Sequence, residues 1–153
     1  MNKQEISIIL PVLNEEENLK FLIPDILRIL GEIGISDHEI IVVDDNSTDN
    51  TSEIVNEFIS SNLSVVYKLR SGVKSLPLSI FEGIEIAKYE NVLWLDADGS
   101  MDAESIKTIL NTFFKDNCDV VIGSRFIEGG GYKGLEKNTK STLKNLQYIP
   151  IAA

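Results

Sequence analysis

Five runs of apolar, largely β-branched residues divide this chain. The runs cover residues 6–12, 39–43, 64–69, 91–95 and 119–123. Such near-continuous apolar character is typical of strands buried on both faces of a parallel sheet. In the segments between the runs, apolar residues recur at i, i+3 and i+4, which indicates amphipathic helices. The alternation predicts an α/β fold, a mostly parallel sheet with helices on both faces.

Four helices are expected to accompany these strands. The first should start at Asn14 as its N-cap and run to about Gly34, with Pro24 either kinking it or marking a boundary. Proline fits the first turn of a helix, so Pro77 would lie near the start of the third. The third helix is expected to turn four residues toward the core, namely Ile80, Phe81, Ile84 and Ala87.

Residues 1–153 are expected to form a single domain, because the chain is long enough for one core and no linker divides it. The formal net charge of −10 argues against nucleic-acid binding. No stretch of about 18 apolar residues occurs, and Met1–Glu5 is too polar for a signal peptide. Cys118 is the single cysteine. These features predict a cytoplasmic protein without an internal disulfide.

Polar residues follow four of the expected strands. They are Asn14-Glu15, Asp44-Asp45, Asp96 with Asp98, and Ser124-Arg125. Ligands of parallel α/β sheets bind at the carboxyl ends of the strands, so these clusters predict one site at that edge.

Asp96 and Asp98 form the sharpest of these clusters. Two carboxylates one residue apart can share a hard divalent ion that keeps positions open for phosphate oxygens. A calcium loop is disfavoured because its twelfth position would be Lys107, and a haloacid dehalogenase phosphatase normally carries such a pair after its first strand. A solvated turn before a helix is the remaining alternative. The acidic chain would need a divalent cation to hold a diphosphate.

Asp44 and Asp45 could accept hydrogen bonds from a base or a ribose. The alternative is helix capping, for which Ser47 and Asp49 are suitable. A dinucleotide-binding dehydrogenase is disfavoured, since the first strand leads into residues 11–15 and not into a glycine-rich turn.

The end of the chain carries the candidate phosphate-binding cations. Arg125 could donate two hydrogen bonds to a diphosphate, or pair with one of the many acids. Residues 126–153 are expected to form a flexible loop and a basic segment. On a helix, Lys137, Lys140 and Lys144 would share one face beside Ser141, either to bind phosphate or simply as a solvated face.

The sequence resembles the family-2 glycosyltransferases of GT-A fold, and within them the dolichol-phosphate mannose synthase and polyprenyl-phosphate glycosyltransferase branch. The motifs that carry the resemblance are SIILPVLNEEENL, EIIVVDDNSTDNT, VLWLDADGS and VVIGSRFIEGGG. It implies a Rossmann-like nucleotide-binding half that stops short of the family's catalytic domains. A membrane or membrane-protein partner would then supply the C-terminal part.

The resemblance also implies roles for residues. Those matching Asp96 and Asp98 hold a metal, Mn²⁺ or Mg²⁺, and the diphosphate, while Asp98 and Arg125 take part in catalysis. The acceptor phosphate would meet Arg125, Lys137 and Ser141. The candidate nucleotide-binding residues are Pro11, Val12, Leu13, Asn14, Glu15, Asp44, Asp45, Ser47, Asp96 and Ala97.

The implied reaction is an inverting transfer of a sugar from GDP-mannose or a UDP-sugar to a polyprenyl phosphate, and we expect it at the cytoplasmic face of a membrane. Two alternatives stay open: a glycosyltransferase of cell-surface polysaccharide or glycan synthesis, and a non-catalytic nucleotide-sugar-binding module that needs a partner chain. Three positions depart from the family pattern. They are Leu13, where tyrosine is common, the stretch Ser75-Leu76-Pro77, which replaces a glycine-rich loop, and Lys137, which replaces an arginine.

Overall fold

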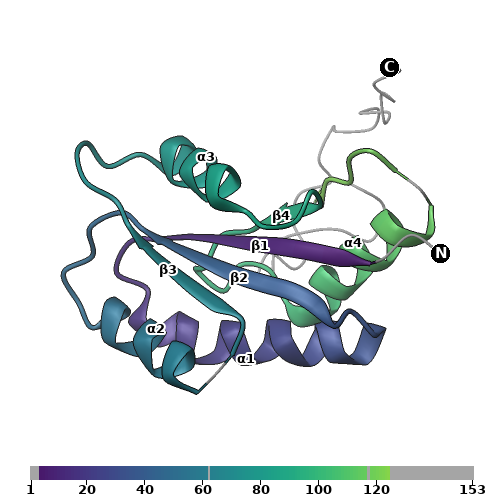
Figure 1. Ribbon diagram of the computed structural model, residues 1–153, viewed down its shortest axis with the longest axis horizontal. Helices are drawn as coiled ribbons and strands as arrows, with labels where there is room; N and C mark the ends of the chain where they lie inside the picture. The colour runs from purple at the N-terminus through teal and green to yellow at the C-terminus, as the bar shows by residue number, and fades with distance from the viewer. Residues whose placement is uncertain (1–3, 62, 117, 125–153) are drawn as a thin grey trace, which may run out of the picture.

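The computed structural model describes residues 4–61, 63–116 and 118–124, which form a parallel sheet with helices on both faces (Figure 1). The strands are β1 (Glu5–Val12), β2 (Asp37–Asp44), β3 (Val65–Leu69) and β4 (Val92–Trp94). The helices are α1 (Glu16–Ile33), α2 (Thr51–Ser60), α3 (Leu76–Ile86) and α4 (Ala103–Lys115). The α/β class and the parallel sheet expected from the sequence are confirmed.

The sheet has the strand order β3-β2-β1-β4, with β1 and β2 at its centre. Val12 at the end of β1 lies beside Asp44 at the end of β2, and Asp44 lies beside Leu69 at the end of β3. Backbone hydrogen bonds extend this register by one step, from Asp45 N to Val12 O and from Arg70 N to Asp44 O. The carboxyl ends of three strands therefore meet at one edge.

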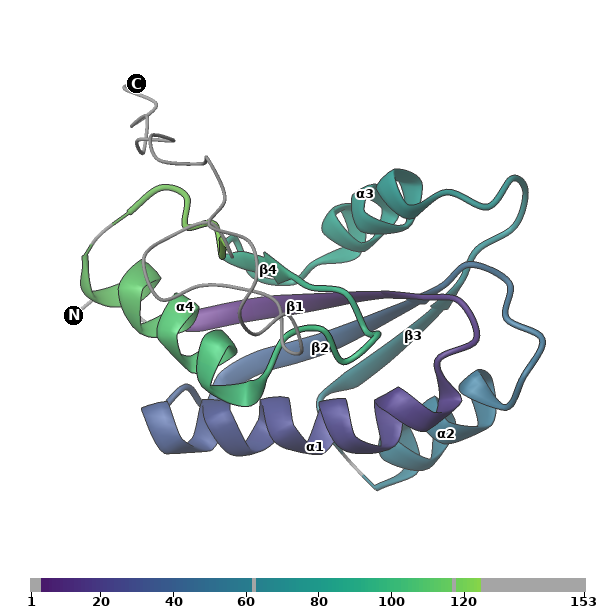
Figure 2. The ribbon, with the colours of Figure 1, turned by 180° about the vertical axis from the view of Figure 1, so that it is seen from behind.

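Helices α1, α2 and α4 lie on one face of the sheet and α3 lies on the other (Figures 1 and 2). The alternation of side chains along a strand divides the core accordingly. One face buries Ile8 and Leu10 of β1 against α1 and α4, while the opposite face buries Ile9 beside Ile41 and Val43 of β2. The larger part of the core is on the α1 side.

Helix α1 starts one residue later than expected. Its N-cap is Glu15, whereas Asn14 has a φ of 60°, outside helical geometry, so the expected N-cap at Asn14 is wrong. The helix runs through Pro24, which does not mark a boundary. It ends as expected at Gly34, where a φ of 80° favours glycine.

Helix α3 faces the sheet with its small residues. Ser79 and Gly83 are buried, while Phe81 is 56% and Ile84 46% exposed, so their expected inward orientation is wrong. Close approach explains the difference: a Cβ atom on Gly83 would lie 2.6 Å from Cγ2 of Ile9. Large side chains would not fit between α3 and β1 at this separation.

The fifth strand expected over 119–123 is wrong, because the described residues there are not in a strand. Val120 and Ile122 are both largely exposed. Strand β4, at the edge of the sheet, is only three residues long and so offers little backbone for a further strand to pair with.

Two helical glycines provide a matched test of the close packing of α3. Replacing either residue by alanine gains about 1 kcal/mol of helix propensity. Gly31 in α1 has nothing within 4 Å of its Cβ position, whereas Gly83 meets Ile9. We expect Gly31→Ala to raise the free energy of unfolding, measured in urea. The free energy of unfolding of Gly83→Ala should be about 1–3 kcal/mol lower than that of Gly31→Ala, because the added methyl group overpacks the contact with Ile9. Equal effects of the two substitutions would contradict this packing.

Candidate functional site

A cavity of about 460 Å³ lies at the edge where the strands end. Many of the candidate site residues line it. They are Pro11, Val12, Leu13, Glu15, Asp45, Asp96, Ala97 and Asp98. Four further lining residues lie before and within α3, and the sequence predicted no site role for them: Lys74, Ser75, Leu76 and Ser79. The cavity thus joins the segments that follow all four strands of the described sheet.

The segments after β1 and β2 are tied to each other by hydrogen bonds. Asn14 N donates to Ser47 Oγ at 2.8 Å, and Asn14 Oδ1 accepts from Thr48 N at 2.7 Å. Glu15 N donates to Thr51 Oγ1 at 3.1 Å. Neither Asn14 nor Ser47 lines the cavity. Their placement indicates that they hold the Leu13–Glu15 wall in place, and direct contact with a nucleotide stays a prediction for both.

Glu16 and Asp49 add a second layer to this connection. Glu16 N donates to Asp49 Oδ2 at 3.2 Å, and Asn50 N donates to Glu16 Oε2 at 2.7 Å. Burial acts to raise the pKa of Asp49, but hydrogen bonds from Thr51 and from backbone N–H groups outweigh it and lower that pKa. The ionised form is therefore favoured in the folded state. Its contribution to stability is present above the ordinary aspartate pKa and is lost as pH falls through the lowered value.

The two adjacent aspartates after β2 have different surroundings. Asp44 is buried and does not line the cavity. Its Oδ1 accepts from Ser47 N at 2.8 Å and its Oδ2 from the Tyr67 hydroxyl at 2.6 Å. Burial and this hydrogen bond raise the pKa of Tyr67 well above its usual value. Asp44 therefore connects β2 to β3 and to the following turn, and its predicted nucleotide contact stays untested.

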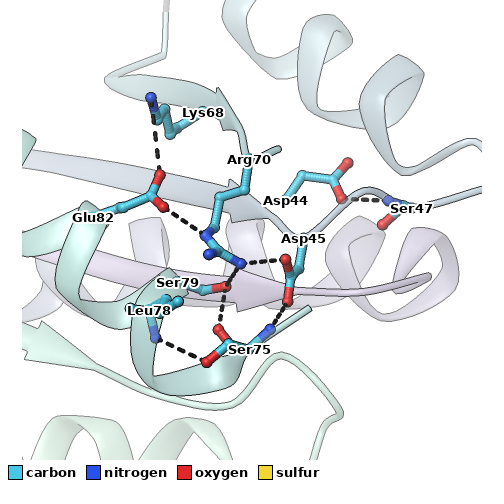
Figure 3. A network of polar contacts seen from close by, with 9 residues as sticks. All are labelled: Asp44, Asp45, Ser47, Lys68, Arg70, Ser75, Leu78, Ser79 and Glu82. Atoms are coloured by element: carbon cyan, nitrogen blue, oxygen red, sulfur yellow. Dashed lines mark hydrogen bonds and ion pairs between the residues drawn. The ribbon is translucent and has the colours of Figure 1, made fainter. Parts of the chain in front are cut away.

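Asp45 lines the cavity and is ion-paired with Arg70 (Figure 3). Its other oxygen, Oδ2, accepts from Ser75 N at 2.5 Å. Arg70 is only 4% exposed and was missed in the sequence. The available signal was its position, because Arg70 directly follows β3 just as Asp45 directly follows β2.

Asp96 and Asp98 are both exposed and flank the buried Ala97 in the turn after β4. Asp98 Oδ1 accepts from Ser100 N at 2.9 Å. Within the described residues, no group of three or more histidine, cysteine, aspartate or glutamate side chains is placed to hold a metal ion. Two carboxylates alone suit a hard divalent ion whose remaining ligands are phosphate oxygens and water.

The candidate acceptor residues Arg125, Lys137 and Ser141 lie outside the described residues, as does the basic segment 126–153. Among the residues that the structure describes, Lys74 is the cation that lines the cavity. None of the described helices is long and apolar enough to cross a membrane.

The chain belongs to glycosyl transferase family 2, whose model matches residues 7–151. A dolichol-phosphate mannosyltransferase from Pyrococcus furiosus is 34% identical over 126 residues, 82% of this chain and 34% of that protein. The poly(ribitol-phosphate) β-N-acetylglucosaminyltransferase TarP from Staphylococcus aureus is 28% identical over 130 residues, 84% of this chain and 38% of that protein. The chain therefore spans little more than a third of the length of these relatives.

Solved structures agree on the GT-A fold. Residues 1–349 of TarS from S. aureus, in complex with UDP, match with a TM-score of 0.62 and 23% identity, over 80% of this chain and 39% of that one. The mannosyltransferase PcManGT from Pyrobaculum calidifontis, in complex with GDP-Man and Mn²⁺, matches with a TM-score of 0.51 and 21% identity, over 71% of this chain and 32% of that one.

The connection between the two loops can be tested at Asn14. Asn14→Ala removes the hydrogen bond from Thr48 N and strains a backbone with a φ of 60°. We expect it to lower the free energy of unfolding by about 1–2 kcal/mol, and Asn14→Gly to cost about 1 kcal/mol less because glycine tolerates that φ. Urea unfolding measures both. The control is Asn56→Ala on the exposed face of α2. If Asn56→Ala lowered the free energy of unfolding as much as Asn14→Ala, the role of Asn14 in connecting the two loops would be contradicted.

Proposed function

We propose that this chain forms the donor-binding part of a glycosyltransferase that moves a sugar from a nucleotide diphosphate to a polyprenyl phosphate. One observation carries the proposal: Asp45, Asp96 and Asp98 line the same cavity at the carboxyl ends of the strands. That cavity offers a hydrogen-bond acceptor for a base and carboxylates for a metal–diphosphate group. Family membership and the GT-A fold support this use of the cavity.

The base of the donor binds beside Asp45 in this proposal. An ionised carboxylate only accepts hydrogen bonds, so it selects a base edge that presents N–H donors. Pro11, Val12 and Leu13 supply apolar surface on the same side of the cavity. The structural neighbours were solved with UDP and with GDP-Man, and both bases present such N–H groups. We therefore keep both donors open.

Asp96 and Asp98 would hold the divalent ion, Mn²⁺ or Mg²⁺. The residues fit it: both are exposed oxygen donors on one turn, and the chain carries a net charge of −10 that would otherwise repel a diphosphate. A bound ion stabilises the negative charge that develops on the leaving diphosphate. The PcManGT complex, which contains Mn²⁺, supports this choice.

A phosphate acceptor is consistent with the position of the single histidine, which lies away from the cavity. Such an acceptor is ionised at neutral pH, so its attack on the sugar needs no general base. The single histidine, His38, pairs with Ile6 at the beginning of the β strands, at the edge opposite the cavity. The P. furiosus relative supports a dolichol-phosphate acceptor. We propose that Arg125, Lys137 and Ser141 bind the acceptor phosphate, with the reaction at the cytoplasmic face of a membrane.

A second candidate is transfer to a cell-surface polymer. The similarity to TarP, which is named as a poly(ribitol-phosphate) β-N-acetylglucosaminyltransferase, favours it. Donor binding without turnover on either class of acceptor would instead support a nucleotide-sugar-binding module that acts with a partner chain.

Transfer of radiolabelled sugar separates these candidates. With Mn²⁺ and UDP- or GDP-sugars, we expect label to pass to polyprenyl phosphate and not to poly(ribitol phosphate). Asp98→Asn should lower kcat/KM at least about 100-fold, as expected for the loss of one electrostatic contact to the leaving group. Asp116→Asn, an exposed aspartate at the end of α4, serves as the control and should retain activity. Label on the polymer alone would support the second candidate.

A further inference from the structure

Asp45 and Arg70 form a buried ion pair that extends to Glu82 on α3 (Figure 3). Arg70 Nη1 donates to Asp45 Oδ1, and Arg70 Nε donates to Glu82 Oε1 at 2.9 Å. The guanidinium is therefore held at two of its nitrogens by carboxylates from different elements. This arrangement is open to arginine, whose donors form a rigid planar fork, and not to lysine, which has a single nitrogen.

The N-terminal end of α3 completes the setting of Asp45. Ser75 N donates to Asp45 Oδ2 at 2.5 Å, and Ser79 Oγ lies 3.4 Å from Arg70 Nη1. Each carboxylate oxygen of Asp45 thus has one protein donor. Ionised carboxyl groups accept about four hydrogen bonds, so each oxygen keeps acceptor capacity for a ligand.

The two members of the ion pair differ in their access to the cavity. Asp45 lines the cavity, whereas Arg70 does not and is 4% exposed. The positive charge of Arg70 therefore acts on the ligand through Asp45. Without Arg70, a buried carboxylate would lose its partner and one of the two contacts that orient it.

We infer that Arg70 is a positioning residue for the nucleobase: anchored by Glu82, it holds the Asp45 carboxylate oriented toward N–H donors of the base. This inference rests on the proposed donor-binding function of the cavity. It assigns a role in donor recognition to Arg70 and Glu82, neither of which lines the cavity.

A double-mutant cycle on the full chain tests the inference. Calorimetry measures the dissociation constants of UDP and GDP with Mn²⁺ for wild type, Arg70→Lys, Asp45→Asn and the double variant, with circular dichroism to verify folding. For the better nucleotide, Arg70→Lys should weaken binding about tenfold in the wild-type background, and less than twofold in the Asp45→Asn background. Affinity for Mn²⁺ with inorganic pyrophosphate should stay within twofold of wild type in all variants, because that ligand has no base.

Two further variants complete the design. Glu82→Gln keeps the shape of the side chain that holds Arg70 but removes its charge. It should weaken nucleotide binding less than Arg70→Lys does, and only when Asp45 is present. If Arg70→Lys does not fold, the Glu82→Gln variant tests the positioning role in its place. Arg28→Lys, a surface arginine paired with Asp25 and Glu32 on α1, is the matched control and should bind like wild type.

The outcomes separate the inference from the proposed function. Equal losses for Arg70→Lys with and without Asp45, or equal losses for nucleotide and pyrophosphate, would overturn the positioning role while leaving the donor site intact. No binding of either nucleotide by folded wild type would overturn both.

Discussion

The parallel register of β1 and β2 is the constraint on which the site depends. The two strands pair over their full length, from Glu5 beside Asp37 to Val12 beside Asp44. A buried hydrogen bond marks this register, because Ser7 Oγ donates to Oε1 of its paired residue Glu39 at 2.6 Å. The paired strands thereby bring the side chains that follow them to one edge of the sheet.

The acidic groups at this edge are held in two different ways. Asp45 is buried and bound by Arg70 and Ser75, which gives it one orientation. Asp96 and Asp98 lie exposed on a turn, where a metal ion can reach their carboxylates. A fixed acceptor suits recognition of a base, which has a defined edge, and exposed carboxylates suit a cation and its phosphates. The difference in burial thus matches the two parts of a nucleotide-sugar donor.

The sequence predicted the features that depend on local pattern. Apolar runs located the four strands of the sheet, and Asp45, Asp96 and Asp98 were found because acids at strand ends are unusual. It did not single out Arg70, whose importance comes from partners distant in the sequence, Asp45 after β2 and Glu82 on α3. The expected orientation of α3 is also wrong. The apolar residues of this helix lie on all of its sides, so their spacing does not show which side faces the sheet. The small Gly83 decides the orientation through contact with Ile9, a long-range effect.

The most direct measurement is a crystal structure of the chain with Mn²⁺ and UDP or GDP, recorded so that the anomalous signal locates the manganese. We expect a manganese peak in contact with the carboxylates of Asp96 and Asp98 and with the diphosphate. We also expect the base in the same cavity, with an N–H group directed at Asp45. Manganese or nucleotide bound elsewhere, or a base that makes no contact with Asp45, would contradict the proposed donor site.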